Sequence, residues 1–224
     1  MPETWTVVLP VKPFHQAKSR LAGWRSASRQ DLAHAFFRDT LDAVRDTTGV
    51  GRVLVVTNDP QAAAEAALLG AMTVIDHPRS GLNAAVRRAI CQMRALAENG
   101  PIAVLTTDLP ALRSAELGHV LAEAALHEKA FLADRTGQGT TLLAAALPQW
   151  LTPSFEGNSA HRHRLDDAHE ITGLDVPSVR LDVDTLDDLH LARQLGVGRH
   201  TQDALTLALQ TRWHPRHARE DHSP

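Results

Sequence analysis

The sequence predicts an α/β fold in which a mostly parallel sheet lies between two layers of helices. Short apolar runs rich in β-branched residues alternate along the chain with longer segments whose apolar residues recur every three to four positions. The short runs are apolar at nearly every position, which is typical of strands covered by helices on both faces. This alternation of buried strands and helices is the pattern of a doubly wound fold.

Four strands and three helices are expected in the first half of the chain. The helices are the segments with a three-to-four-residue apolar period, at 28–47, 60–69 and 82–97. Pro60 suits the first turn of the second helix, where its missing N–H would have no partner. The strands are the apolar runs 4–11, 52–57, 71–75 and 101–106.

Beyond residue 127 the pattern predicts a hairpin followed by mixed elements. Two strands, 130–134 and 139–147, flank the glycine-rich turn RTGQG. We expect a single domain over residues 1–200, then a C-terminal helix and a disordered tail over 201–224. The remaining expected elements are a helix near 158–169, a last strand at 178–184, and helices at 186–195 and 201–211.

Composition and charge exclude several functional classes. The 224 residues carry a net charge of −3, whereas binding to nucleic acid or to a membrane surface needs a basic face. No apolar run approaches the length of about 18 residues that a membrane span needs. Cys91 is the only cysteine, so an intrachain disulfide is impossible, which fits a reducing compartment. We therefore expect a cytoplasmic protein with no nucleic-acid or membrane partner, and a homodimer is left open.

Three aspartates stand where the ends of parallel strands would bring them together. Asp108 follows the fourth expected strand, and Asp182 and Asp184 lie two residues apart in the last one, so they share a face. Carboxylates from neighbouring strand ends form a suitable cage for a hard divalent cation such as Mg²⁺, which prefers oxygen ligands. The alternative is local, because an aspartate after a strand can simply cap the next helix.

The first loop, within LPVKPFHQAKSRLAG, carries Lys12, Lys18 and Arg20 in a chain with no basic excess. At the same edge of the sheet as the aspartates, these cations could bind a polyphosphate whose other oxygens bind Mg²⁺. The competing interpretation is a solvated turn, which an isolated K-S-R would favour. A metal–phosphate site requires both acidic and basic groups, and the sequence supplies both.

The other motifs are less specific. The chain has no G-x-x-x-x-G-K-[ST] and no G-x-S-x-G, so it contains neither a P-loop nor the nucleophile elbow of a hydrolase. Asn83 in GLNAAV stands at a helix entrance, where it could cap the helix or contact the edge of a base. His161 and His163 in HRHR could bind a transition metal, but histidines among arginines are more often solvated, and this interpretation is preferred.

Six segments, in the same order along the chain, resemble the guanylyltransferases of coenzyme F-420 biosynthesis, the 2-phospho-L-lactate guanylyltransferase family. The resemblance covers residues 5 to about 200 and implies a nucleotidyltransferase fold of the glycosyltransferase-A-like, Rossmann-like type. The segments that carry it are LPVKPFHQAKSRLAG, GLNAAV, TDLPAL, ADRTGQGTTLL, HRHR and LDVDTLDDLHLARQLGVG.

The reaction that this resemblance implies is transfer of GMP from GTP to the phosphate of phosphoenolpyruvate, with Mg²⁺ as cofactor. Its products would be enolpyruvoyl-2-diphospho-5'-guanosine and diphosphate. Phospholactate is the alternative acceptor, and another nucleotidyltransferase of the same fold is a further alternative. A non-catalytic nucleotide-binding module is the interpretation from a different functional class.

The resemblance also implies roles for individual residues. It assigns Mg²⁺ binding to Asp108, Asp182 and Asp184, and the phosphoenolpyruvate pocket to Thr140, Glu156 and Ser159. Glu156 stands where the family has glycine, so only its backbone is expected to contact the acceptor. The residues expected to bind the nucleotide are Lys12, Lys18, Arg20 and Asn83, and those expected to act in catalysis are Lys18, Arg20 and Asp108.

Overall fold

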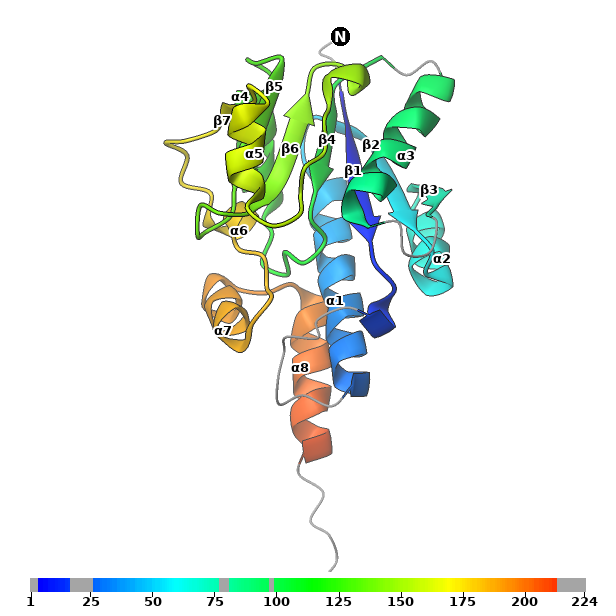
Figure 1. Cartoon of the computed structure of the whole chain (residues 1–224). Helices are drawn as coiled ribbons and strands as arrows, with labels where there is room; N and C mark the ends of the chain where they lie inside the picture. The colour runs from blue at the N-terminus through cyan, green and yellow to red at the C-terminus, as the bar shows by residue number, and fades with distance from the viewer. Residues whose placement is uncertain (1–3, 17–25, 77–80, 97–98, 213–224) are drawn as a thin grey trace, which may run out of the picture.

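The computed structural model describes residues 4–16, 26–76, 81–96 and 99–212 (Figure 1). Its centre is a seven-stranded sheet in the order β3-β2-β1-β4-β6-β5-β7. The first four strands along the chain and the hairpin β5–β6 confirm predicted strands. The strands are β1 (Trp5–Val11), β2 (Val50–Thr57), β3 (Met72–Ile75), β4 (Ile102–Leu105), β5 (Lys129–Ala133), β6 (Thr140–Ala145) and β7 (His169–Glu170).

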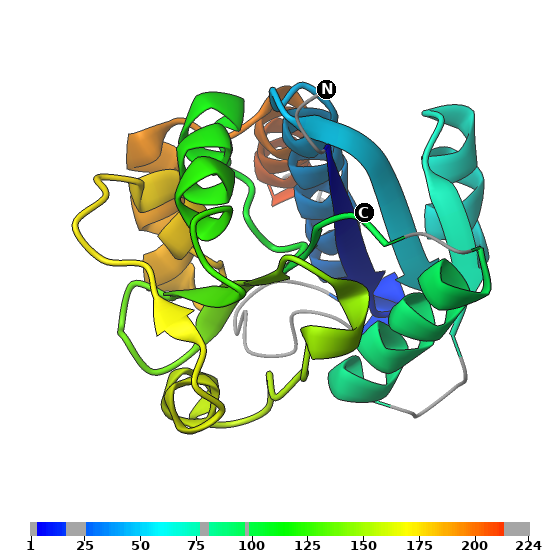
Figure 2. The same ribbon diagram turned by 90° about the horizontal axis from the view of Figure 1, so that it is seen from above.

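Helices cover the sheet on both faces (Figure 2). No helix in the described ranges is long and apolar enough to cross a membrane. The helices are α1 (Ser26–Arg45), α2 (Pro60–Leu68), α3 (Leu82–Ala95), α4 (Ser114–Ala124), α5 (Ser159–Leu165), α6 (Pro177–Arg180), α7 (Leu186–Leu195) and α8 (Arg199–Arg212), with the 3-10 helices η1 (Phe14–Gln16) and η2 (Pro148–Trp150).

The strand directions bring several chain segments to one edge of the sheet. β2 and β4 run parallel to β1, and β3 runs parallel to β2. β5 and β7 share this direction, because β6, which separates β4 from β5, is antiparallel to both. The carboxyl ends of β1, β4 and β5 therefore lie at the same edge as the amino end of β6. The strand order reverses between β1 and β4, and α/β folds bind ligands outside such a switch point.

The apolar character of the central strands follows from their position between two cores. In β1, Val7, Leu9 and Val11 pack in the cluster formed with α1, α2 and α4. Val8 points the other way, into the cluster formed with α3 and α5. Because both faces of the strand are buried, nearly every position is apolar, as the sequence pattern indicated.

The last helix, α8, packs on α1 and confirms the helix predicted over 201–211. Leu205 of α8 is buried in a cluster with α1 and α7. Asp39 of α1 caps α8, since its carboxylate accepts hydrogen bonds from the N–H groups of His200 (3.0 Å) and Thr201 (2.8 Å). Burial raises the pKa of Asp39, and these hydrogen bonds oppose the rise. The domain division at residue 200 stays a prediction, and the predicted disordered tail lies outside the described residues.

The prediction of a strand over 178–184 is wrong. Pro177 begins the short helix α6 instead, because proline fits the first helical turn, and residues 181–184 belong to no strand. A hydrogen bond from Val183 N–H to the carbonyl of Asp108 (2.9 Å) joins this segment to the sheet edge. The helix predicted near 158–169 is shorter than expected and is followed by β7, which, like α4, has no counterpart among the predicted elements.

Candidate active site

A cleft of about 730 Å³ lies at the sheet edge where β1 and β4 end. The residues on its walls come from the end of β1, the chain after β1, β4 and β5, the start of β6 and one side of α1. The starts of α3 and α5 and the segments before α3, α5 and α7 supply the others. This is the switch point between β1 and β4 at which a ligand is expected. The predicted site residues that line the cleft are Lys12, Asp108, Thr140, Glu156, Ser159, Asp182 and Asp184.

The acidic side of the cleft is built by the chain after β4 and by the segment before α7. The hydrogen bond from Val183 N–H to the carbonyl of Asp108 holds the two segments side by side. Burial, and then the negative charges of Asp108, Asp184 and Asp134, raise the pKa of Asp182 to about 7. A cation would relieve this crowding of carboxylates, and oxygen donors are the ligands that hard divalent cations prefer. The donor set therefore fits Mg²⁺.

Asp134 is an acidic cleft residue that sequence reasoning missed. Its Oδ1 accepts hydrogen bonds from Thr136 Oγ1 (2.9 Å) and from Gln138 N–H (3.1 Å). Its other oxygen lies against Gly139, where any side chain would collide with it. The sequence position of Asp134 could have indicated it, because it directly follows β5 as acidic residues follow other strands. Its place at the cleft could not be predicted from this alone, because it depends on the direction of β5, which the strand pairing sets.

Of the three cations predicted for the basic side of the cleft, Lys12 is the one that lies within the described residues. Lys12 follows β1, and its exposed side chain lines the cleft. The chain after it is anchored by Phe14, whose N–H donates to Asp59 Oδ2 (3.0 Å), and Asp59 also caps α2. Lys18 and Arg20 lie outside the described residues, so their roles stay predictions.

Two buried hydroxyl groups line the cleft at the start of β6 and of α5. Ser159 Oγ donates to Thr140 Oγ1 (3.1 Å), and Thr140 Oγ1 lies 3.0 Å from Nδ1 of His163. Glu156 is exposed, and its carboxylate lies against Gly81 at the start of α3. This places the Glu156 carboxylate at a helix N-terminus, which favours a negative charge.

Asn83 anchors a loop of the site. Its Oδ1 accepts a hydrogen bond from the N–H of Phe155 (2.8 Å), which connects α3 to the segment before α5. Gly81 is the N-cap of α3, so Asn83 is not its cap. Asn83 is not on the cleft wall among the described residues, whereas Phe155 is. Its predicted contact with the guanine base stays a prediction.

The solvated interpretation of His163 is wrong. The residue is 0% exposed, and its ring lies against those of Phe131 and Phe155. The backbone N–H of Ser154 donates to its Nε2 (3.2 Å), while Nδ1 faces Thr140. Desolvation lowers the pKa of His163 to about 4, so the ring is neutral at neutral pH.

His163 is expected to make stability depend on pH below neutrality. The unfolded chain takes up a proton on this ring near pH 6.5, whereas the folded protein resists protonation down to about pH 4. At this residue the unfolded state therefore binds more protons in this range, and the contribution of His163 to the free energy of unfolding should fall by about 2 kcal/mol between about pH 7 and pH 5. Because the raised pKa of Asp182 acts in the opposite direction over the same interval, the His163 contribution is the difference between the pH dependences of the wild type and His163→Phe. Urea denaturation at both pH values checks this, with the exposed His161→Gln as control. The same pH dependence in the wild type and in His163→Phe would contradict it.

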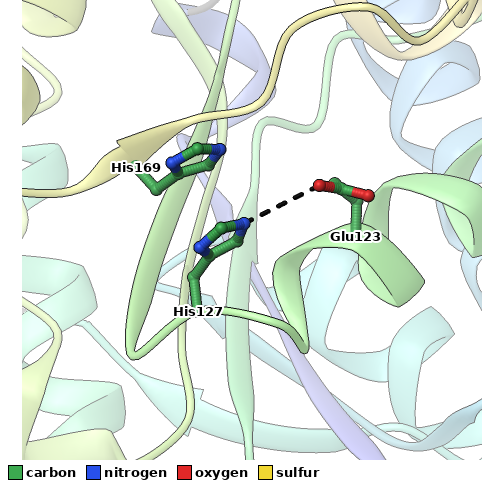
Figure 3. A group of neighbouring side chains, drawn as sticks. All are labelled: Glu123, His127 and His169. Atoms are coloured by element: carbon green, nitrogen blue, oxygen red, sulfur yellow. Dashed lines mark ion pairs between the residues drawn. The ribbon is translucent and has the colours of Figure 1, made fainter.

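Another group of potential ligand atoms lies away from the cleft. Glu123, His127 and His169 place one such atom each within 4.8 Å of one another (Figure 3). The two imidazole rings are stacked, with centroids 3.6 Å apart and 11° between the planes, and His127 Nε2 lies 3.7 Å from Glu123 Oε1. Lone pairs of ring nitrogens lie in the ring planes, so two parallel rings do not direct them toward a common point. This arrangement is a stacked pair beside a carboxylate, and its geometry does not match a metal centre.

Comparison with known protein families identifies the chain. The family described as guanylyl transferase CofC like matches residues 5–220. The chain belongs to this family. The phosphoenolpyruvate guanylyltransferase of Streptomyces scabiei is 49% identical to this CofC-like chain over 210 residues, covering 92% of the chain and 97% of that protein. The protein of the same name from Streptomyces coelicolor is 48% identical over 198 residues, covering 88% and 93%. The family predicted from six sequence segments is thereby confirmed.

Solved structures share the fold of this CofC-like chain. A putative nucleotide-diphospho-sugar transferase from Desulfovibrio desulfuricans has a TM-score of 0.66 at 14% identity, covering 92% of the chain and 97% of that protein. A 4-diphosphocytidyl-2C-methyl-D-erythritol synthase gives 0.60 at 15%, covering 87% and 99%. Rv0371c of Mycobacterium tuberculosis, solved in complex with manganese, gives 0.54 at 19%, covering 86% and 98%. The predicted glycosyltransferase-A-like nucleotidyltransferase fold is confirmed.

Proposed function

We propose that the chain transfers GMP from GTP to the phosphate of phosphoenolpyruvate and releases diphosphate. The observation that carries this proposal is a single cleft lined both by an aspartate cluster and by two buried hydroxyl groups. The aspartates suit a metal-bound triphosphate, and the hydroxyls suit an acceptor that carries carboxylate and phosphate oxygens. The names of the two Streptomyces relatives support the same reaction.

Asp108, Asp182 and Asp184 are the residues that would hold Mg²⁺. The raised pKa of Asp182 supports this assignment, because it reflects a buried carboxyl group beside the negative charges of Asp108, Asp184 and Asp134. The manganese complex of the mycobacterial neighbour also supports a divalent ion. When bound, the ion would neutralise the triphosphate and orient its α-phosphate for in-line attack. Asp134 could assist from the same cleft, with its turn holding it in place.

The side chains of this protein are proposed to position the reactants and to balance their charge. A phosphate monoester has a second pKa near 6, so the acceptor is mostly dianionic at neutral pH and needs no general base. Lys12 would add positive charge at the cleft, and Thr140 and Ser159 would hold acceptor oxygens. The rate of transfer then depends on geometry and electrostatics, as in other phosphoryl-transfer enzymes.

Lys18→Ala and Arg20→Ala are each expected to lower kcat/KM for GTP about tenfold to hundredfold, because a charge-assisted contact contributes roughly 1.5–3 kcal/mol. Steady-state kinetics with GTP varied at saturating acceptor measures the effect. Arg88→Ala is the matched control, since Arg88 is exposed on α3 and does not line the cleft. Unchanged kinetics in both loop variants would support a solvated turn instead.

Pyrophosphate release with a panel of substrates tests the proposed function. GTP, ATP and CTP are each combined with phosphoenolpyruvate, phospholactate and a sugar phosphate. We expect release with GTP and phosphoenolpyruvate, and slower release with phospholactate. Preference for phospholactate or a sugar phosphate would support the alternative nucleotidyltransferases, and no release with any pair would support a non-catalytic nucleotide-binding module.

A further inference from the structure

We propose that His163 is a positioning residue that sets the direction of the Thr140 hydroxyl proton, so that this hydroxyl donates to the acceptor anion. The inference rests on the proposed function, because it assigns a task at the acceptor side of the same cleft. His163 is not among the described residues that line the cleft, whereas Thr140 lines it. His163 would therefore act on the acceptor through Thr140.

A backbone contact decides which ring nitrogen of His163 carries the proton. A backbone N–H can only donate, and that of Ser154 lies 3.2 Å from Nε2. Nε2 must therefore be the unprotonated, accepting nitrogen. Burial keeps the ring neutral, so its single proton is on Nδ1. The loop before α5 thus fixes the tautomer of the ring.

The tautomer in turn decides what Thr140 offers to the cleft. Nδ1–H of His163 lies 3.0 Å from Thr140 Oγ1, which also accepts a hydrogen bond from Ser159 Oγ at 3.1 Å. A hydroxyl oxygen has two lone pairs and one proton. With both lone pairs occupied, the proton of Thr140 is left for a third partner in the cleft. In the opposite tautomer, Nδ1 would take this proton, and Thr140 would present a lone pair that repels a carboxylate or phosphate.

Packing holds the ring in the position that this chain of hydrogen bonds requires. The centroid of the His163 ring lies 5.6 Å from that of Phe131 in β5 and 5.5 Å from that of Phe155. Phe131 is fully buried, and Phe155 is itself held by the hydrogen bond from its N–H to Asn83 of α3. The sheet and α3 therefore jointly determine where Nδ1 points.

Kinetics of two substitutions separate positioning from a general structural role. His163→Phe keeps the ring volume and removes both hydrogen bonds, whereas His163→Asn can keep a donor near the position of Nδ1. We expect His163→Phe to lower kcat/KM for phosphoenolpyruvate about tenfold to hundredfold with the KM for GTP unchanged, and His163→Asn to restore most of the loss. In a Thr140→Val background, His163→Phe should have little further effect. Equal losses for GTP and acceptor, or additive losses in the double variant, would overturn the inference.

Nitrogen-15 NMR of the imidazole rings in the full chain shows which nitrogen of His163 carries the proton, and it does so independently of activity. The His163 signals are assigned by their loss in His163→Phe, and we expect the Nδ1–H tautomer at about pH 7. An Nε2–H tautomer or a cationic ring would overturn the inference, whether or not the protein turns over phosphoenolpyruvate. If the wild type released no pyrophosphate with any acceptor but showed the expected tautomer, the proposed function would fail while the arrangement of the proton would be supported.

Discussion

Asp182→Asn is expected to remove turnover and, at the same time, to make the metal-free protein more stable. The pKa of Asp182 is raised to about 7 in the folded protein, well above its ordinary value. Its ionisation therefore lowers the free energy of unfolding progressively between about pH 4, below which the group is protonated in both states, and about pH 7. Asparagine keeps the shape of the side chain and removes the charge. Because it also removes an anionic metal ligand, kcat/KM should fall about a hundredfold or more.

Urea denaturation at about pH 8 with a chelator, together with steady-state kinetics at ordinary Mg²⁺ concentration, measures both effects. Asp175→Asn is the control, since Asp175 is exposed and does not line the cleft. Asp108→Asn and Asp184→Asn should lose turnover to a similar degree, because each removes one anion from the same cluster. Near-wild-type rates in any of these three cleft variants would contradict the metal assignment, and a less stable Asp182→Asn protein would contradict the crowding of charge.

Thr140→Val is expected to impair use of the acceptor while leaving GTP affinity nearly unchanged. Valine keeps the branched shape of a side chain that is only 6% exposed, so no large cavity forms. It removes the hydroxyl that lines the cleft and that would donate to an acceptor oxygen. Hydrogen bonds to charged groups contribute roughly 1.5–3 kcal/mol, which predicts a loss of about tenfold to hundredfold in kcat/KM for phosphoenolpyruvate.

The comparison that decides this prediction is GTP binding by calorimetry against acceptor kinetics in the same variant. Ser159→Ala should also lower kcat/KM for the acceptor, though less than Thr140→Val, because Ser159 donates to Thr140, and it should leave GTP binding nearly unchanged. Thr206→Val, at an exposed position of α8, is the matched control. If GTP binding and acceptor use were lost in parallel, the hydroxyls would serve the nucleotide.

The central sheet could be predicted because buried parallel strands leave a local signal. β1 and β4 are apolar at nearly every position, and the helices between the strands show their own period. The strand predicted over 178–184 failed because its apolar residues pack without a neighbouring strand, which local sequence cannot reveal. The two-residue β7 depends entirely on its pairing with β5. The helix α4 could have been predicted, since its buried residues follow a helical period.

Much of the candidate site could be predicted because its residues follow strand ends that share an edge. Asp108 reaches the cleft in this way. Thr140, which the family resemblance assigned, begins β6 at the same edge. Asp134 was missed because its place depends on the direction of β5, which the antiparallel β6 sets. His163 was misjudged because its burial depends on aromatic residues distant in sequence. The roles of these residues stay predictions, as do the cytoplasmic location and a homodimer.

The mass of the product formed from GTP and phosphoenolpyruvate tests the central claim most directly. The wild type is incubated with GTP, Mg²⁺ and either phosphoenolpyruvate or phospholactate, and the products are separated and weighed by mass spectrometry. We expect a guanosine diphosphate ester that contains the intact enolpyruvoyl group, formed in step with pyrophosphate and absent with Asp182→Asn. Formation of a phospholactate ester alone, or of GDP and free phosphate without any joined product, would contradict the proposed transfer of GMP to phosphoenolpyruvate.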